Sequence, residues 1–181
     1  MFRKYLVGVL AAMTHLVASG ATIAASGSTN IPVSASVSQS CAITTASALA
    51  FGAYDPVGVN VTAALNATGQ VSVACSKGAT GLTIGMDNGT NAAGGQRQMK
   101  GGGTGAGNLQ YNLFQPPSNT PGTACVFPGT TAWTNTGNGV LTLTSAPTKV
   151  ARVYNVCGTI PGGQDVPVDL YTDMVSATLN F

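Results

Sequence analysis

The stretch that decides the fold is Val175-Ser176-Ala177-Thr178-Leu179-Asn180-Phe181, at the end of the 181-residue chain. Apolar and polar side chains alternate through it without a break. Successive side chains of a β-strand point to opposite faces of the sheet, so this alternation predicts a strand with one buried and one solvated face.

The same period of two recurs in short stretches upstream, at residues 31–38, 71–74, 82–84, 109–114 and 140–144. Turn-forming residues separate these stretches, including Asp87-Asn88-Gly89, Asn138-Gly139 and Pro161-Gly162-Gly163. After residue 26, no window of a dozen residues keeps apolar side chains at helical spacing. Short strands divided by turns are typical of antiparallel sandwiches, and we expect an all-β fold.

Residues 1–25 are predicted to be a secretory signal peptide. Arg3 and Lys4 form a positive start, residues 6–18 are mostly apolar, and small residues dominate 21–25. The apolar stretch is shorter than the roughly 20 residues that span a bilayer. An uncleaved anchor is the alternative interpretation. We therefore expect an exported chain of about 156 residues, forming one domain with no membrane span after cleavage.

Charge is scarce, with 7 Lys+Arg, 5 Asp+Glu and a single histidine, His15. Without the predicted signal the chain keeps five basic and five acidic residues and no histidine. Nucleic-acid binding needs a basic face that neutralises phosphates, and five scattered cations do not form one. Histidine-dependent triads and Cys/His zinc sites are excluded too. We expect no cofactor, no metal and no nucleic-acid partner.

Four cysteines in an exported chain are expected to form two disulfides. None of them lies in a Cys-x-x-Cys spacing. Three connectivities are possible, and proximity in the sequence favours Cys41–Cys75 with Cys125–Cys157. In the chain-entropy model each such bond stabilises the fold by roughly 3–4 kcal/mol.

The alternating stretch at residues 30–38 admits two interpretations. Its apolar face consists of Ile31, Val33, Ala35 and Val37. One interpretation is an ordinary first strand that pairs with its own sheet. The other is a strand given to the sheet of another molecule by β-augmentation. Pro32 has no N–H to donate to a ladder, which suits an edge or an inserted strand in either case.

The order of several motifs carries a resemblance. They are Cys41-Ala42-Ile43, Leu49-Ala50-Phe51-Gly52-Ala53-Tyr54-Asp55-Pro56, Val71-Ser72-Val73-Ala74-Cys75, Arg97-Gln98-Met99-Lys100-Gly101-Gly102-Gly103, Leu109-Gln110-Tyr111-Asn112-Leu113-Phe114, Trp133, Gly158-Thr159-Ile160-Pro161-Gly162-Gly163-Gln164-Asp165-Val166-Pro167 and Tyr171-Thr172-Asp173. Together they resemble the spore coat protein U family, which includes subunits of archaic chaperone–usher pili. The chain departs from the family pattern in an enlarged loop at residues 115–131, in the additional pair Cys125 and Cys157, and in Asp169, where a small turn residue is expected.

The resemblance implies an incomplete immunoglobulin-like antiparallel β-sandwich, which lacks one edge strand and is completed by a donor strand. Residues 26–40 would be the N-terminal donor-strand extension, and residues 41–181 the β-sandwich domain. The donor residues would be Ile31, Val33, Ala35 and Val37. The terminal strand would contact the chaperone through Val175, Ala177, Leu179 and Phe181. The expected partners are a periplasmic pilus chaperone, an outer-membrane usher and further subunits in a head-to-tail polymer.

The function that follows is a structural subunit of an extracellular fimbria, which supports surface adhesion and biofilm formation. It would pass through the periplasm and end in a surface fimbrium or a secreted coat. A spore or cell coat protein is the alternative, and a carbohydrate-binding module a weaker one. For the latter, Tyr111, Phe114, Phe127 and Trp133 are candidate aromatics, although core packing is the simpler explanation.

An enzyme is not expected. Asp169 and Asp173 lie close in the sequence and could form a catalytic carboxylate pair. Most of the acidic residues fall beside Gly or Pro, however, where capping of turns is the simpler role.

Overall fold

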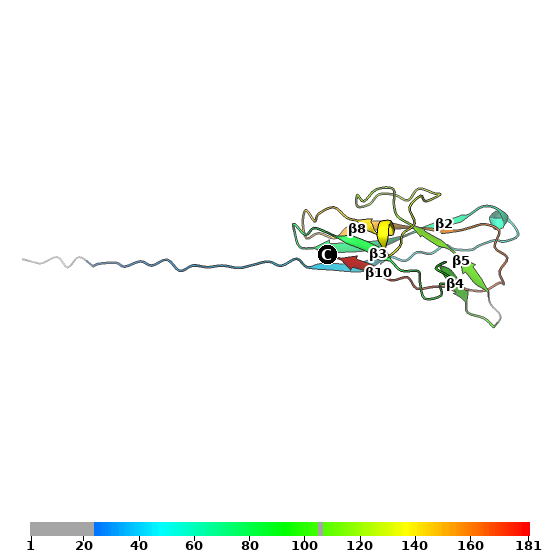
Figure 1. Ribbon diagram of the computed structural model, residues 1–181, viewed down its shortest axis with the longest axis horizontal. Helices are drawn as coiled ribbons and strands as arrows, with labels where there is room; N and C mark the ends of the chain where they lie inside the picture. The colour runs from blue at the N-terminus through cyan, green and yellow to red at the C-terminus, as the bar shows by residue number, and fades with distance from the viewer. Residues whose placement is uncertain (1–23, 105–106) are drawn as a thin grey trace, which may run out of the picture. The chain divides into compact units, whose positions relative to one another are not determined.

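The computed structural model describes residues 24–104 and 107–181 (Figure 1). All but the last two residues of the predicted signal peptide lie outside the described residues. The chain divides into two units, Met1–Ser36 and Val37–Phe181. In the first unit, residues 24–36 belong to no helix or strand and expose their side chains. No helix in the described ranges is both long and apolar enough to cross a membrane.

The described residues of the second unit form ten strands. They are β1 (Cys41–Ser47), β2 (Leu65–Cys75), β3 (Thr83–Met86), β4 (Gln98–Gly101), β5 (Asn108–Gln110), β6 (Asn112–Phe114), β7 (Leu141–Thr142), β8 (Arg152–Ile160), β9 (Tyr171–Thr172) and β10 (Ala177–Asn180). Two 3-10 turns, η1 (Val59–Val61) and η2 (Gly137–Gly139), are the helical elements of the described residues. All strand pairs are antiparallel, so the expected antiparallel all-β fold is confirmed.

The strands form three sheets, in the orders β1-β2-β8-β6, β10-β3-β7 and β5-β4-β9. The 11-residue strand β2 is the longest and sets the length of the domain. At one end of it Cys75 pairs with Cys41, and at the other Leu65 pairs with Ile160. Since a strand rises about 3.3 Å per residue, these two ends lie about 33 Å apart.

The core fills the space between the sheets. Its fully buried side chains are Trp133, Tyr154, Leu82, Ile84, Ile160 and Val73. The indole of Trp133 donates a hydrogen bond of 2.9 Å to the carbonyl of Ile84, and its main-chain N–H donates one of 2.8 Å to Leu113. Trp133 and Tyr111 are therefore core residues, and neither is available to an aromatic surface platform.

The burial of strand β8 does not alternate along the chain, because both of its faces are covered. Residues 154–158 are buried without interruption. The loop at residues 115–131 lies over the face opposite the core, where Asn155 donates a side-chain hydrogen bond of 2.7 Å to Thr123. Gly122 adds a main-chain bond of 2.8 Å to Val153. The enlarged loop therefore covers the outer face of β8 and shields it from solvent.

The structure contains two disulfides, which have the pairing that proximity in the sequence favours. Cys41–Cys75 joins directly opposed residues of β1 and β2. Cys125–Cys157 joins the loop at residues 115–131 to β8. In the described part of the chain no cysteine is free.

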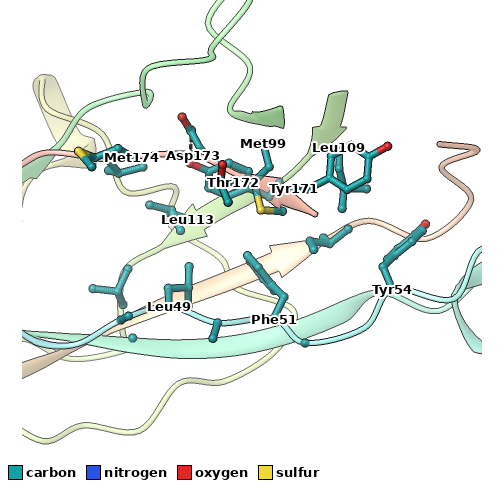
Figure 2. A pocket seen from close by; sticks show the side chains of 18 of the residues that line it. Leu49, Phe51, Tyr54, Met99, Leu109, Leu113, Tyr171, Thr172, Asp173 and Met174 are labelled. Atoms are coloured by element: carbon teal, nitrogen blue, oxygen red, sulfur yellow. Dashed lines mark hydrogen bonds between the residues drawn. The ribbon is translucent and has the colours of Figure 1, made fainter. Parts of the chain in front are cut away.

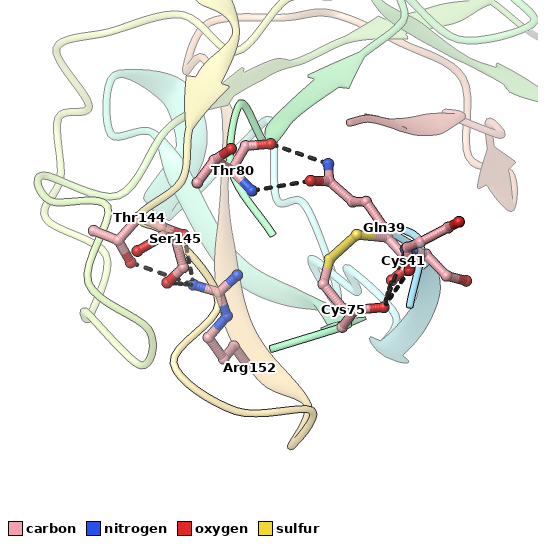
Figure 3. The surroundings of a disulfide bond; sticks show 10 residues. Gln39, Cys41, Cys75, Thr80, Thr144, Ser145 and Arg152 are labelled. Carbon is pink, nitrogen blue, oxygen red and sulfur yellow. Dashed lines mark hydrogen bonds between the residues drawn. A yellow bond between two sulfur atoms is a disulfide. The ribbon is translucent and has the colours of Figure 1, made fainter. Parts of the chain in front are cut away.

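Beside the first disulfide, the side-chain amide of Gln39 pairs with the main chain of Thr80 (Figure 3). It donates a hydrogen bond of 3.1 Å to the carbonyl of Thr80 and accepts one of 3.2 Å from its N–H. Ser40 and Ser76 are joined in the same region, by a bond of 2.8 Å from the N–H of Ser76 to the carbonyl of Ser40. The chain is therefore fixed to the domain from Gln39 onward.

Candidate functional site

A groove of about 1030 Å³ opens between two edges of the domain. One wall is formed by β1 and the following residues 48–56, and the other by residues 166–177, which include β9. Each of β1, β9 and β10 is the outermost strand of its sheet. Within the described residues, these strands therefore keep unpaired main-chain groups along the groove.

The floor of the groove is the apolar core itself. It is made by Val71, Met86, Met99, Leu109, Tyr111, Leu113, Val156 and Ile160. Most of these side chains are buried, and Met99 is half-buried. A sandwich that lacks a strand leaves such a combination of apolar floor and unpaired edges.

The first wall presents Leu49, Phe51 and Tyr54 to the groove, as Figure 2 shows. Leu49 and Phe51 reach this position because β8 has a glycine beneath them. A Cβ on Gly158 would lie 2.6 Å from Cδ2 of Leu49 and 2.8 Å from Cζ of Phe51. The ring of Phe51 meets Tyr111 edge to face, with 6.2 Å between the ring centroids. The absence of a side chain at Gly158 therefore leaves the space that Leu49 and Phe51 occupy in the first wall.

Tyr54 closes one end of the groove through the motif around Pro161. Its hydroxyl donates a hydrogen bond of 3.1 Å to the carbonyl of Pro161 and accepts one of 2.9 Å from the N–H of Gln164. The side chain of Gln164 then pairs with the main chain of Gln110, accepting at 2.7 Å and donating at 2.9 Å. These bonds explain why a tyrosine and a Pro-Gly-Gly-Gln run occur together.

The second wall alternates between half-buried and exposed residues. Tyr171, Asp173, Val175, Ala177 and Leu179 are half-buried, and Thr172, Met174, Ser176, Thr178 and Asn180 are exposed. The inner residues pack against the rim of the core on one side only. Of the residues predicted for the terminal strand, Val175 and Phe181 lie outside β10, and Phe181 is exposed.

Asp173 connects the second wall to the floor of the groove by hydrogen bonds. Its carboxylate accepts hydrogen bonds of 2.6 Å from the hydroxyl of Tyr111, 2.9 Å from Thr90, and 3.1 and 3.0 Å from the main chain and side chain of Asn91. Gly89, with φ +83°, leaves the space for it, since a Cβ there would lie 2.0 Å from the carboxylate. Partial burial raises the pKa of Asp173, but the hydrogen bonds it accepts hold that pKa below its ordinary value.

Burial, together with the bond to Asp173, raises the pKa of Tyr111 above its ordinary value. Beneath this pair lies the buried guanidinium of Arg97, which donates hydrogen bonds of 3.1 Å to the carbonyl of Met86 and 2.7 Å to that of Trp133. Burial lowers the pKa of Arg97, and its interactions with Tyr111 and the nearby carboxylates oppose that change. Tyr111, Asp173 and Arg97 thus form a hydrogen-bonded polar cluster beneath the apolar groove.

The carboxylates considered as a catalytic pair are both engaged in hydrogen bonds. Asp169 accepts bonds of 2.7 Å from the N–H of Gly103 and from that of Leu170. Asp173 has the partners given above. Among residues 24–104 and 107–181, no three His, Cys, Asp or Glu side chains are placed to hold a metal ion.

The predicted donor residues lie in no strand of their own domain. Ile31 is 79% exposed, Val33 92% and Val37 91%, and Ala35 is exposed as well. The interpretation of residues 30–38 as an ordinary first strand is therefore wrong for this structure. Val175 and Ala177 of the second wall were among the predicted contact residues. The first wall was not predicted as a site, although the alternation of Leu49 and Phe51 about Ala50 was a signal for it.

Comparison with known proteins gives three likenesses. The sequence model of the Spore Coat Protein U domain matches residues 28–178. The chain is 32% identical to "Protein U" of Myxococcus xanthus over 189 residues, which cover 98% of each chain. It also resembles, with a TM-score of 0.44 and 20% identity, a crystal structure of the CsuC–CsuE chaperone–tip adhesion subunit pre-assembly complex from archaic chaperone–usher Csu pili of Acinetobacter baumannii. That likeness covers 80% of this chain but spans only 40% of the length of the other.

Proposed function

The chain belongs to the Spore Coat Protein U domain family, and we propose that it is a structural subunit of an extracellular fibre. In this fibre the N-terminal segment of one copy fills the groove of another. One observation carries the proposal: an apolar groove with unpaired edges and an exposed alternating segment occur in the same chain. The groove lacks a strand, and the segment has the side-chain pattern of a strand but no sheet to pair with.

The segment matches the groove in chemistry and is short enough to fit along the domain. Residues 31–37 in extended form span about 20 Å, which fits along a domain whose two ends lie about 33 Å apart. Ile31, Val33, Ala35 and Val37 would face the apolar floor, and the serines between them would face solvent. Burial contributes about 1.5–3 kcal/mol for each of the larger side chains. Main-chain hydrogen bonds to the unpaired edges would add to this.

An open groove of this kind promotes aggregation until it is filled. A periplasmic pilus chaperone would cover it first, by contacts that include Val175, Ala177, Leu179 and Phe181, and an outer-membrane usher would then pass the subunit into the polymer. On this proposal residues 1–25 are the signal peptide, 26–40 the donor extension and 41–181 the domain. The subunit passes through the periplasm to the cell surface, where the fimbria supports adhesion and biofilm formation. Its role is structural and not catalytic.

A secreted spore or cell coat is the second candidate. The description of the family, which names a spore coat, favours it. The assembly step would be the same, and the product would be a layer instead of a filament. Electron microscopy of cells with and without the protein distinguishes thin surface filaments from a coat.

The test of groove filling uses the full chain with Val33→Asp and Val37→Asp, which removes its own ability to donate while leaving the groove open. A synthetic peptide of residues 26–40 is added, and thermal unfolding is followed. The unaltered peptide should raise Tm by about 5 °C or more, because it binds only the folded state. A peptide with Val33→Asp should have little effect. Equal effects of the two peptides, or no effect of either, would refute the proposal.

A further inference from the structure

The charged side chains of the domain are divided between its two ends. At the end where β1 begins, which we call the cysteine end (residues 41, 75–80 and 145–152), lie Lys77, Lys149 and Arg152. At the opposite end, which we call the proline end (residues 55–63 and 161–170), lie Asp55, Asp165 and Asp169. All three aspartates and both lysines are exposed.

Hydrogen bonds hold each end together. At the cysteine end the N–H of Gly78 donates a bond of 2.8 Å to the carbonyl of Ala146, which joins the loops that carry Lys77 and Lys149. At the proline end the N–H of Gly163 donates a bond of 2.8 Å to the carbonyl of Asn60. Each group of charges therefore belongs to one surface.

Of the other charged residues after position 25, Lys100 alone departs from this division. Asp87, Arg97 and Asp173 gather beside the groove floor, where Arg97 donates to the carbonyl of Asp87 at 2.9 Å. Lys100, in β4, is an exposed cation that lies close to the proline end, where Gly102 donates to the carbonyl of Leu170 and Gly103 donates to Asp169. Most of the exposed charged side chains of the domain therefore lie at its two opposite ends.

Exposed apolar side chains accompany the charges. Val57 is 88% and Val59 73% exposed at the proline end, and Val150 is 69% exposed at the cysteine end. Val168 and Leu170, also exposed, line the groove where it reaches the proline end. Apolar residues bordered by charges are the usual composition of a protein–protein interface.

The linker between donor segment and domain is very short. Val37 is the last residue of the alternating face, and Gln39 is already tied to Thr80. Two peptide units span about 7 Å at most. A donated strand must therefore bring its own domain against the end of the groove from which the strand leaves.

The direction of insertion decides which end that is. The two free edges run in opposite directions, because β1 begins at the cysteine end and β10 finishes near it, with Asn180 opposite Thr83. A donor strand is therefore antiparallel to one edge and parallel to the other, and the charges at the two ends distinguish the two directions. A donor strand antiparallel to β10 leaves the groove at the proline end, and its cysteine end then meets the acceptor's aspartates. The opposite direction would bring two basic cysteine ends together.

We propose that the proline end of one copy is a docking surface for the cysteine end of the next copy. This inference rests on the donor-strand assembly proposed above. The opposite charges orient the incoming copy and set the direction of insertion. Because exposed charges act mainly on encounter and orientation, the contact should raise the rate of assembly more than the final stability of the fibre.

The test follows reassembly of the full chain from denaturant by light scattering, at about 20 mM and about 500 mM salt. Lys149→Glu should slow assembly about tenfold at low salt. The difference should nearly vanish at high salt, where screening acts within a few ångströms. Adding Asp165→Lys to Lys149→Glu should recover part of the rate, since it restores opposite signs across the contact.

Lys100→Glu is the matched control, because it makes the same change of charge away from the cysteine end, and it should not slow assembly. The peptide of residues 26–40 should stabilise the donor-defective chain equally with and without Lys149→Glu. Assembly of Lys149→Glu at the unaltered rate in low salt would overturn the docking surface, even where the peptide still binds. Failure of the peptide would instead refute groove filling itself.

Discussion

The hydroxyl of Tyr111 donates a hydrogen bond of 2.6 Å to the carboxylate of Asp173. Tyr111 belongs to the buried floor of the groove, and Asp173 belongs to its second wall. This bond links the floor to the wall directly, and it acts together with the bonds that the same carboxylate accepts from Thr90 and Asn91.

Tyr111→Phe removes that bond and keeps the packing of the ring. We expect the free energy of unfolding to fall by about 1–2 kcal/mol, as for loss of a hydrogen bond to a charged group. The peptide of residues 26–40 should also bind more weakly, because the wall is less well placed. Urea unfolding and peptide titration measure the two effects. Tyr171→Phe is the control, since its hydroxyl donates to Pro167 at the exposed rim, and an equal loss there would contradict the role given to Tyr111.

Stability should depend on pH through the same pair. The folded state holds the pKa of Asp173 below its ordinary value, so the unfolded chain takes up the proton more readily. The stabilising effect of this carboxylate is therefore complete above about pH 4 and is lost as the pH falls through the folded pKa. The raised pKa of Tyr111 acts in the other direction, and its contribution is lost as the pH rises beyond about 10. Urea unfolding across this range should show both losses, and Asp173→Asn should flatten the acid side; an unchanged profile would argue against the pair.

Gly158→Ala tests the seat of the first wall. The new methyl group would overlap Leu49 and Phe51, and displacing them should lower the free energy of unfolding by about 1–3 kcal/mol. Because both side chains line the groove, peptide affinity should fall as well. Gly102→Ala is the matched control, since no atom lies within 4 Å of a Cβ there. Equal behaviour of the two variants would show that the space above Gly158 does not matter.

Val33→Asp should abolish fibre formation in cells while leaving a folded subunit. A charged side chain on the face that enters the groove would lose its hydration without gaining a partner. Electron microscopy and recovery of monomer from the periplasm give the readout. Ser34→Asp places the same charge on the opposite face and should still assemble. Filaments of normal number in the Val33→Asp cells would count against groove filling.

The two disulfides should differ in their effect on the groove. Replacing Cys125 and Cys157 by serine should cost about 3–4 kcal/mol of stability but leave peptide binding intact, because this bond holds a loop on the outer face of β8. Replacing Cys41 and Cys75 should lower both, since β1 is part of a groove wall. Unfolding and peptide titration of the two double variants separate these outcomes. Loss of binding in both would show that the second disulfide also supports the groove.

Local patterns in the sequence were sufficient to predict strands that have one buried and one solvated face. The alternation at residues 175–181 and 71–74 corresponds to β10 and to part of β2. Strand β8 was not predicted, because the loop at residues 115–131 covers its outer face and the buried Cys157 interrupts the polar positions Asn155 and Thr159 on that face. The alternation of polar and apolar residues reflects solvent exposure of one face. It is therefore a weak signal for a strand that is covered on both faces.

The groove could not be predicted from local patterns at all. Its walls, at residues 48–56 and 166–177, are more than a hundred residues apart in the sequence. Asp173 was assigned to capping of turns, and its bond to Tyr111 depends on the same long-range approach. What the sequence did signal was the other half of the site, the alternating segment at residues 30–38.

The clamp between Gln39 and Thr80 has a consequence for the length of the proposed fibre. Folding residues 31–37 back as a hairpin on β1 would use residues 38–40 as the turn, yet Gln39 and Ser40 are tied to Thr80 and Ser76. A copy is thus prevented from closing its own groove. A row of copies always retains one empty groove at one extremity and one unused strand at the other. Growth has no internal stopping point, so supply of subunits or a dedicated terminating protein must set how long the filament becomes.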